Sequence, residues 1–198
     1  MAAWSSPVGL PGLATLALGF VLFVASLLVA RGRSTPDIGG GGKRSLRSLG
    51  GVMLQGLGIA IIGFGPIRAV LPAASPGAIA GGLAVAVLMG GAIALFTSAS
   101  RAMGRNWAIV AQTRSDHQLV TTGPFARVRH PIYVAMFLFA LALAAAFGHF
   151  WHLLLGAPIY WFGTARRVAI EERLLRDQFG VAYDDYARRV RRFVPGVI

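Results

Sequence analysis

The chain has 198 residues, of which 56% are hydrophobic and only 13% are charged, and its formal net charge is +12. Soluble domains contain about 45–50% apolar and about 25% charged residues, so this composition excludes a disordered chain, argues against a soluble domain and predicts a small integral membrane protein. The chain has no cysteine, which excludes disulfides and thiolate metal sites.

The first apolar run, Val8–Ala30, is long enough for a transmembrane helix, which needs about 20 residues. A cleaved signal peptide is not expected, because no basic residue precedes the run and its length exceeds the roughly 7–15 residues of such segments. Two further runs, Leu49–Ile67 and Ala78–Ser98, predict a second and a third helix. The break between them, Pro66–Gly77, contains three prolines and one charged residue, Arg68.

The fourth run, Pro131–Ala165, contains no Lys, Arg, Asp or Glu and is too long for one typical helix. Because Gly148–His149 interrupts it, we expect a hairpin of two short helices, Ile132–Phe147 and a second from Phe150 onward. The last segment, Arg166–Arg192, is charged and helical in pattern. The sequence therefore predicts an all-α integral membrane bundle of about five transmembrane helices, including the short hairpin, with a cytoplasmic C-terminal helix.

The basic residues give this bundle an orientation. With five spans, eighteen of the nineteen Lys and Arg residues lie on one face, and Arg68 alone lies on the other. Cytoplasmic loops are enriched in Lys and Arg, so we expect the protein in an inner or plasma membrane, with its N-terminus outside and its C-terminus in the cytoplasm. Membrane topology explains the charge, and no nucleic-acid partner is expected.

Five of the seven acidic residues lie between Glu171 and Asp185, and Glu171–Glu172 are the only glutamates. One interpretation is a salt-bridged helix surface, because Arg167–Glu171 and Glu172–Arg176 both have the i,i+4 spacing. The other is a ligand site, since ionisable groups at a membrane boundary often face an interior cavity.

A second candidate feature is the turn that precedes the hairpin. Gly123-Pro124 favours a turn, and Pro131 suits the first turn of a helix. His130 then lies beside a helix N-terminus, where free N–H groups favour an anionic group such as a carboxylate. The alternative is a basic turn at the membrane surface, with Tyr133 as an interfacial aromatic residue. No metal site is expected, because no histidine lies in a metal-binding pattern.

Three stretches together resemble the isoprenylcysteine carboxyl methyltransferase family, whose members are integral membrane enzymes that use S-adenosylmethionine. The first stretch is His117-Gln118-Leu119-Val120-Thr121-Thr122-Gly123-Pro124-Phe125, and the second is Arg129-His130-Pro131-Ile132-Tyr133. The third is Glu171-Glu172-x-x-Leu175-x-x-x-Phe179-Gly180-x-x-Tyr183-x-x-Tyr186. The resemblance covers roughly residues 101–196, and the first two helices match only as hydrophobic spans.

This resemblance implies a set of site residues. Arg167 would bind the substrate carboxylate and, with Glu171, would be catalytic. The apolar runs and the glycine-rich composition predict an N-terminal region of transmembrane helices (1–98) with a flexible linker (31–48), and the resemblance implies a C-terminal catalytic region (99–198). The residues expected to bind S-adenosylmethionine are Gln112, His117, Gln118, Leu119, Val120, Phe125, His130, Pro131, Ile132, Tyr133 and Glu171.

The expected reaction is methyl transfer from S-adenosylmethionine to a lipophilic or lipidated substrate in the bilayer, with the carboxylate of a prenylcysteine as the family's own substrate. Methylation of a phospholipid amine is an alternative. An NADPH-dependent enzyme like the sterol reductases is another, because those proteins also have an Arg-His-Pro-x-Tyr turn. They usually follow it with Gly-Glu, where this chain has Ala135-Met136. A membrane scaffold without activity would explain the topology but not both motifs.

Overall fold

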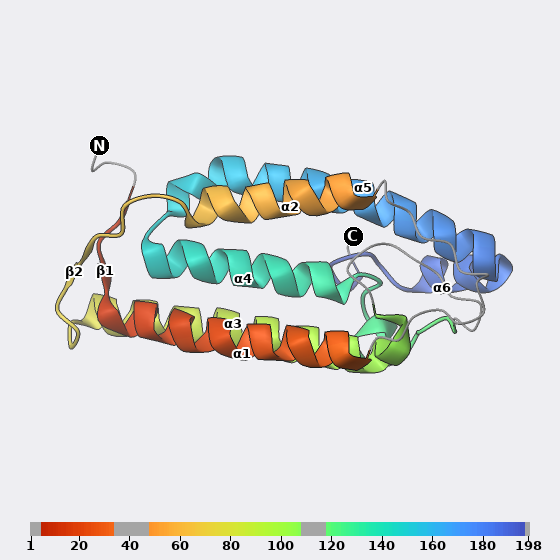
Figure 1. The fold of residues 1–198 in the computed structure, drawn as a ribbon, viewed down its shortest axis with the longest axis horizontal. Coiled ribbons are helices and arrows are strands. Elements are labelled where there is room, and N and C mark those ends of the chain that lie inside the picture. The colour runs from red at the N-terminus through yellow and green to blue at the C-terminus, as the bar shows by residue number, and fades with distance from the viewer. Residues whose placement is uncertain (1–4, 34–47, 108–117, 197–198) are drawn as a thin grey trace.

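The computed structural model describes residues 5–33, 48–107 and 118–196, and nearly all of these lie in helices (Figure 1). The long helices are α1 (Leu10–Arg33), α2 (Ser48–Gly63), α3 (Pro76–Met103), α4 (Pro131–Phe147) and α5 (Leu153–Phe179). A short helix, α6 (Val181–Arg189), follows α5, and single 3-10 turns are η2 (Gly104–Asn106), η3 (Gly123–Ala126) and η4 (Phe150–His152). Among the described residues, the only strands are β1 (Val8–Gly9) and β2 (Ala69–Leu71), which pair in parallel. The prediction of an all-α fold is confirmed.

The helices form a flat bundle in which α4 lies between two layers (Figure 1). One layer contains α1 and α3, and the other contains α2 and α5. The two strands lie at one end of the bundle, together with the α4–α5 connection, and α6 lies at the opposite end. Consecutive long helices therefore carry the chain back and forth between a strand end and an α6 end.

The outer faces of the bundle are apolar. α1 and the stretch Pro76–Asn106 are long and apolar enough to cross a membrane, whereas α2 and α4 are apolar but shorter. Large hydrophobic side chains point outward, and Leu18, Met53 and Val87 are 64%, 74% and 74% exposed. Many exposed large apolar side chains indicate contact with a membrane or a partner, and here several of them lie on helices of membrane-spanning length. These are the features of an integral membrane protein.

Glycines bring α2 and α5 into close contact. Gly51 on α2 faces Gly163 on α5, and Gly58 faces Gly156. The two glycines on each helix are seven residues apart, which is about two helical turns. A Cβ atom on Gly58 would lie 2.6 Å from the carbonyl oxygen of Gly156, and one on Gly163 would lie 2.8 Å from that of Gly51. Small residues at such positions allow helix backbones to approach closely in a membrane.

Helices two and three differ in length from the prediction. The second helix ends at Gly63 rather than Ile67, because Gly65 has a φ of 139° and Pro66 disfavours helical geometry in the residue before it. The third helix is Pro76–Met103 rather than Ala78–Ser98, since the Ser75 hydroxyl accepts a hydrogen bond from the Ala78 N–H at 3.3 Å and caps the first turn.

The prediction for the last third of the chain is wrong in one respect. The second helix of the hairpin is not short: α5 continues from the apolar run through Arg166 and ends only at Phe179. A change from apolar to charged residues alters what a helix contacts but does not end it. Gly180, with a φ of 51°, separates α5 from α6, and the chain is extended at Val190 rather than helical to Arg192.

Most of the predicted linker 31–48 lies outside the described residues. The predicted boundary at residue 98 falls inside α3, which packs against both α1 and α4. The division into two regions stays a prediction.

Candidate active site

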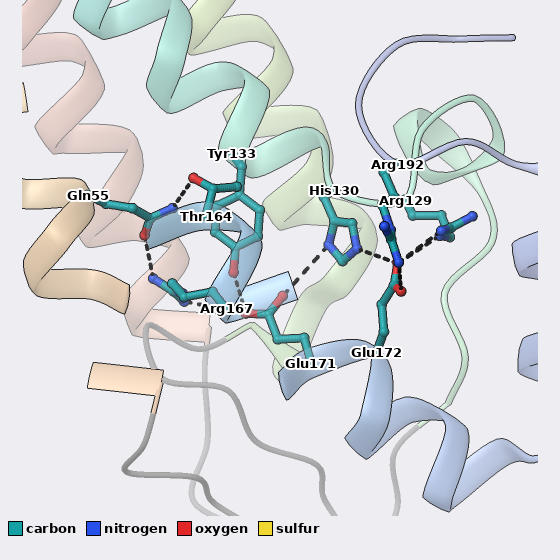
Figure 2. Close-up of polar contacts among 9 residues, drawn as sticks. All are labelled: Gln55, Arg129, His130, Tyr133, Thr164, Arg167, Glu171, Glu172 and Arg192. Carbon is teal, nitrogen blue, oxygen red and sulfur yellow. Dashed lines mark hydrogen bonds and ion pairs between the residues drawn. The ribbon is translucent and has the colours of Figure 1, made fainter. Parts of the chain in front are cut away.

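A row of polar side chains crosses the α6 end of the bundle (Figure 2). The row begins at α2, passes between α4 and α5, and ends at the C-terminal stretch after α6. Its members, in order, are Gln55, Arg167, Glu171, His130, Glu172 and the two arginines Arg129 and Arg192. The helical pitch of α5 places Arg167 and Glu171 one turn apart on the same side.

Glu171 lies in the centre of this row. Its Oε1 atom accepts a hydrogen bond from the Tyr133 hydroxyl and lies 3.4 Å from Nη2 of Arg167. Its Oε2 atom lies 3.7 Å from Nδ1 of His130. The Glu171 side chain keeps 24% of its surface exposed, against 5% for Glu172. Glu171 is therefore the glutamate that a ligand can reach.

Glu172 is buried and bound on every side. Its Oε1 atom lies 3.0 Å from Nη2 of Arg129 and 3.2 Å from Nε2 of His130, and its Oε2 atom accepts from Nη2 of Arg192 at 2.7 Å. Burial alone would raise the pKa of this carboxyl, but hydrogen bonds from His130, Arg192 and Arg129 outweigh it and hold the pKa well below its ordinary value. Glu172 is an anionic anchor.

This anchor fastens the C-terminal stretch to the turn before α4. The backbone N–H groups of Arg129 and His130 donate to the carbonyls of Arg191 and Arg192 at 2.8 and 3.0 Å. Phe193 then packs against the His130 ring, with centroids 5.9 Å apart. The Arg-His-Pro turn and the end of the chain form one unit, although more than fifty residues separate them.

The predicted pair Glu172–Arg176 is wrong, because Glu172 points away from Arg176 toward Arg129 and Arg192. Arg176 instead pairs with Asp184 of α6 at 2.7 Å. The predicted pair Arg167–Glu171 is present at 3.4 Å. Neighbouring glutamates on a helix point about 100° apart, so Glu172 binds the two arginines while Glu171 faces the exposed side of the site.

Arg167 is itself almost buried and is held from two sides. Its Nη1 atom donates to Oε1 of Gln55 at 3.1 Å, and its guanidinium carbon lies 5.1 Å from the centre of the Tyr133 ring. The amide of Gln55 in turn donates to Thr164 at 2.8 Å. Tyr160, one turn before Thr164 on α5, donates from its hydroxyl to the carbonyl of Tyr133 at 2.7 Å.

The structure brings together four of the site residues expected from the sequence: His130, Tyr133, Arg167 and Glu171. Pro131 is buried in the first turn of α4, and Ile132 packs against the apolar core beside α3. Phe125 is buried in η3, and its carbonyl accepts from the Tyr186 hydroxyl at 2.7 Å. Gln118, Leu119 and Val120 lie in the stretch before η3, whereas Gln112 and His117 lie outside the described residues.

Sequence reasoning missed Gln55, Thr164 and the role of Glu172. The signal for Gln55 was present, because it is the only side chain with a strongly polar group in the run Leu49–Ile67. Polar residues inside membrane helices usually serve a site or a partner. The contacts of Glu172 depend on the fold and had no local signal.

These features define a class: an integral membrane protein with an ion-paired polar site at one end of a helical bundle. The family model described as the isoprenylcysteine carboxyl methyltransferase (ICMT) family matches residues 83–177. This region contains α4, most of α5 and the four residues that meet at the site. Residues 83–177, just under half of the chain, thus match the isoprenylcysteine carboxyl methyltransferase family, as the motifs indicated.

Curated relatives align with the same half of the chain. The protein-S-isoprenylcysteine O-methyltransferase of Schizosaccharomyces pombe is 40% identical over 88 residues, which are 44% of this chain and 37% of that protein. Protein-S-isoprenylcysteine O-methyltransferase B of Arabidopsis thaliana is 30% identical over 96 residues, 48% of this chain and 49% of that protein. The nickel-cobalt-cadmium resistance protein NccN of Alcaligenes xylosoxydans is 34% identical over 94 residues, 47% and 44% of the two chains. The chain therefore spans less than half the length of each of these relatives.

Proposed function

We propose that this protein transfers a methyl group from S-adenosylmethionine to the carboxylate of a lipophilic, prenylcysteine-like substrate. The observation that carries the proposal is the pairing of Arg167 with Glu171 on one turn of α5, at the end of an apolar bundle. The turn presents a cation and an exposed carboxylate side by side. The names of the isoprenylcysteine methyltransferases among the relatives support the same reaction.

The chemistry of Glu171 and its neighbours fits S-adenosylmethionine. The cofactor has an ammonium group and a ribose diol that donate hydrogen bonds, and Glu171 is a partly exposed acceptor for them. His130 precedes the first turn of α4, where free N–H groups favour a carboxylate such as that of the methionine tail. When bound, the cofactor supplies an electrophilic methyl group on its sulfonium. We propose that His130, Tyr133 and Glu171 hold it, with the other predicted residues of the set.

Arg167 is the proposed partner of the substrate. Its planar guanidinium stays charged and matches the geometry of a carboxylate. A carboxylate nucleophile is already anionic and needs no general base. The main task of the protein is therefore to hold the attacking oxygen in line with the methyl group, which is a matter of position and orientation. The apolar outer faces of α2 and α5 would let the lipid tail remain in the bilayer.

We further propose that the long helices cross the membrane five times, with the α6 end in the cytoplasm and the N-terminus outside. Among the described residues, the α6 end carries the basic side chains of α5, α6 and the C-terminal stretch, whereas Arg68 directly precedes β2 at the strand end. This distribution has the sign that the positive-inside rule requires. Tagging both termini and testing protease access in sealed vesicles would check it.

The deciding experiment measures transfer of labelled methyl from S-adenosylmethionine to N-acetyl-S-farnesylcysteine and, in parallel, to phosphatidylethanolamine, with purified protein in detergent. We expect methyl ester formation on the farnesylcysteine only. Label in the phospholipid alone would replace the proposal with N-methylation. Calorimetric binding of NADPH without binding of S-adenosylmethionine would overturn methyl transfer altogether.

A further inference from the structure

Gln55 is an exception in its helix. Apart from Ser48, it is the one residue with a polar side chain among the sixteen residues of α2, and it is only 2% exposed. Burying an amide in an apolar helix costs free energy unless its donors and acceptor are satisfied. Both ends of the Gln55 amide are satisfied by α5, through Arg167 and Thr164.

The network fixes which way this amide points. The Thr164 hydroxyl donates its hydrogen to the carbonyl of Tyr160 at 2.9 Å, so toward Gln55 it acts as an acceptor. Gln55 therefore presents its NH₂ group to Thr164 and its oxygen to Arg167. A guanidinium has only donors, so this orientation is the one that Arg167 requires.

The stem of Arg167 is positioned by the same face of α2. A Cβ atom on Gly51 would lie 2.4 Å from Cγ of Arg167, so only the absence of a side chain at Gly51 leaves room for the stem. One turn along α2, Gln55 holds the head group through Nη1. Figure 2 shows Gln55 and Arg167 facing each other beside Tyr133. α2 thus determines both the path of the side chain and the direction of its charge.

We propose that Gln55 is a positioning residue. It orients Arg167 toward the substrate carboxylate and so makes the site prefer an anionic substrate group over a neutral one. The proposal rests on the proposed function. Helix α2 lies outside residues 83–177, so a segment beyond the family match orients the cation that the family region supplies. A neutral amide suits this role, because it accepts a hydrogen bond without cancelling the positive charge of Arg167, as a carboxylate would.

The test compares Gln55→Leu and Gln55→Glu with wild type, using N-acetyl-S-farnesylcysteine and its methyl ester as probes. Loss of a hydrogen bond to a charged group is worth about 1.5 kcal/mol, so we expect Gln55→Leu to weaken binding of the carboxylate probe about tenfold and to raise its KM similarly. Affinity for the ester and for S-adenosylmethionine should not change. Gln55→Glu should also weaken binding of the carboxylate probe. The glutamate still accepts a hydrogen bond from Arg167, but its negative charge neutralises that of the guanidinium.

The matched control is Ser26→Ala, which removes a partly buried interhelical contact, the hydrogen bond from Thr97 at 3.3 Å, in the opposite layer of the bundle. This substitution should change the affinity for neither probe. If Gln55→Leu weakens binding of the carboxylate and the ester equally, the role of Gln55 is only structural and the proposal is overturned. The same holds if neither affinity changes.

A second measurement needs no substrate. In a double-mutant cycle on thermal stability, Gln55→Leu and Arg167→Leu should give shifts in Tm that do not add, because each removes the same contact. Additive shifts would overturn the positioning role. If wild type binds neither probe, the proposed substrate is wrong, and the cycle still decides whether Gln55 positions Arg167.

Discussion

The hydroxyl of Tyr133, in the first turn of α4, donates a hydrogen bond to the carboxylate of Glu171 on α5. The two residues are 38 positions apart in the chain. This contact joins the Arg-His-Pro-x-Tyr turn to the paired glutamates, which in the sequence are separate motifs. It also leaves Glu171 with a defined direction toward the open side of the site.

Replacing Glu171 with Gln should weaken binding of S-adenosylmethionine, because the carboxylate is the proposed acceptor for the cofactor's donors. Loss of a charge-assisted hydrogen bond predicts an affinity about tenfold lower, which titration calorimetry in detergent can measure. Asp185→Asn is a suitable control, since Asp185 is an α6 residue paired with Arg188 on the surface. If Glu171→Gln binds the cofactor with normal affinity, Glu171 does not bind it, and the Arg167–Glu171 pair is only a structural contact.

Arg167→Ala should abolish methyl transfer while largely sparing cofactor binding. The guanidinium is proposed to hold the substrate carboxylate, and a misplaced nucleophile costs a large factor in rate. Arg167→Lys should recover little, because an ammonium group lacks the planar fork. Single-turnover rates and cofactor affinity on the same preparations separate the two effects, and full activity in Arg167→Ala would contradict the assignment.

Glu172→Gln should destabilise the protein in a pH-dependent way. The pKa of Glu172 is lower in the folded protein than the ordinary carboxyl value near 4.3. The unfolded chain therefore binds more protons below that value, so the stability that Glu172 contributes is present above about pH 5 and is lost as the pH falls. Thermal unfolding from pH 7 to pH 3 should show a lower Tm for Glu172→Gln at pH 7, and the gap should narrow on acidification. A gap that stays constant with pH would show that Glu172 is not an ionised anchor.

Gly58→Ala should lower stability, whereas Gly56→Ala on the same helix should not. A Cβ atom at Gly58 would collide with the backbone of α5, but one at Gly56 meets nothing within 4 Å. Alanine favours a helix over glycine by about 1 kcal/mol, so Gly56→Ala should be neutral or slightly stabilising. Tm values of both variants in the same detergent check this, and equal values would contradict close packing of α2 on α5.

The apolar runs predict the number and order of the long helices, because a run of about 20 apolar residues has few alternatives to a buried or membrane helix. They do not predict where the fifth helix ends. A charge boundary at Arg166 marks a change of surroundings, whereas the helix ends at Phe179, because the backbone of Gly180 takes a φ of 51°. The parallel pairing of Val8 with Ala69 depends on two distant segments and has no local pattern.

Part of the site could also be predicted. His130, Tyr133 and Glu171 stand in the motifs that carry the family resemblance, Arg167 lies one helical turn before the third motif, and the structure brings all four together. The partners of Glu172 could not be predicted from helical spacing, which suggests Arg176. Tertiary contacts decide instead, since Arg129 and Arg192 reach Glu172 from a turn and from the chain end.

The continuity of α5 has a consequence for depth in the membrane. Its apolar part, Leu153–Ala165, has thirteen residues and is therefore about 20 Å long, which is shorter than the roughly 30 Å hydrocarbon layer. If α5 crosses the membrane as we propose, Arg167 lies below the level of the lipid head groups unless the bilayer thins around the protein. A lipid-anchored carboxylate would then meet Arg167 without rising into the aqueous phase, so the thickness of the surrounding bilayer becomes a variable of the reaction.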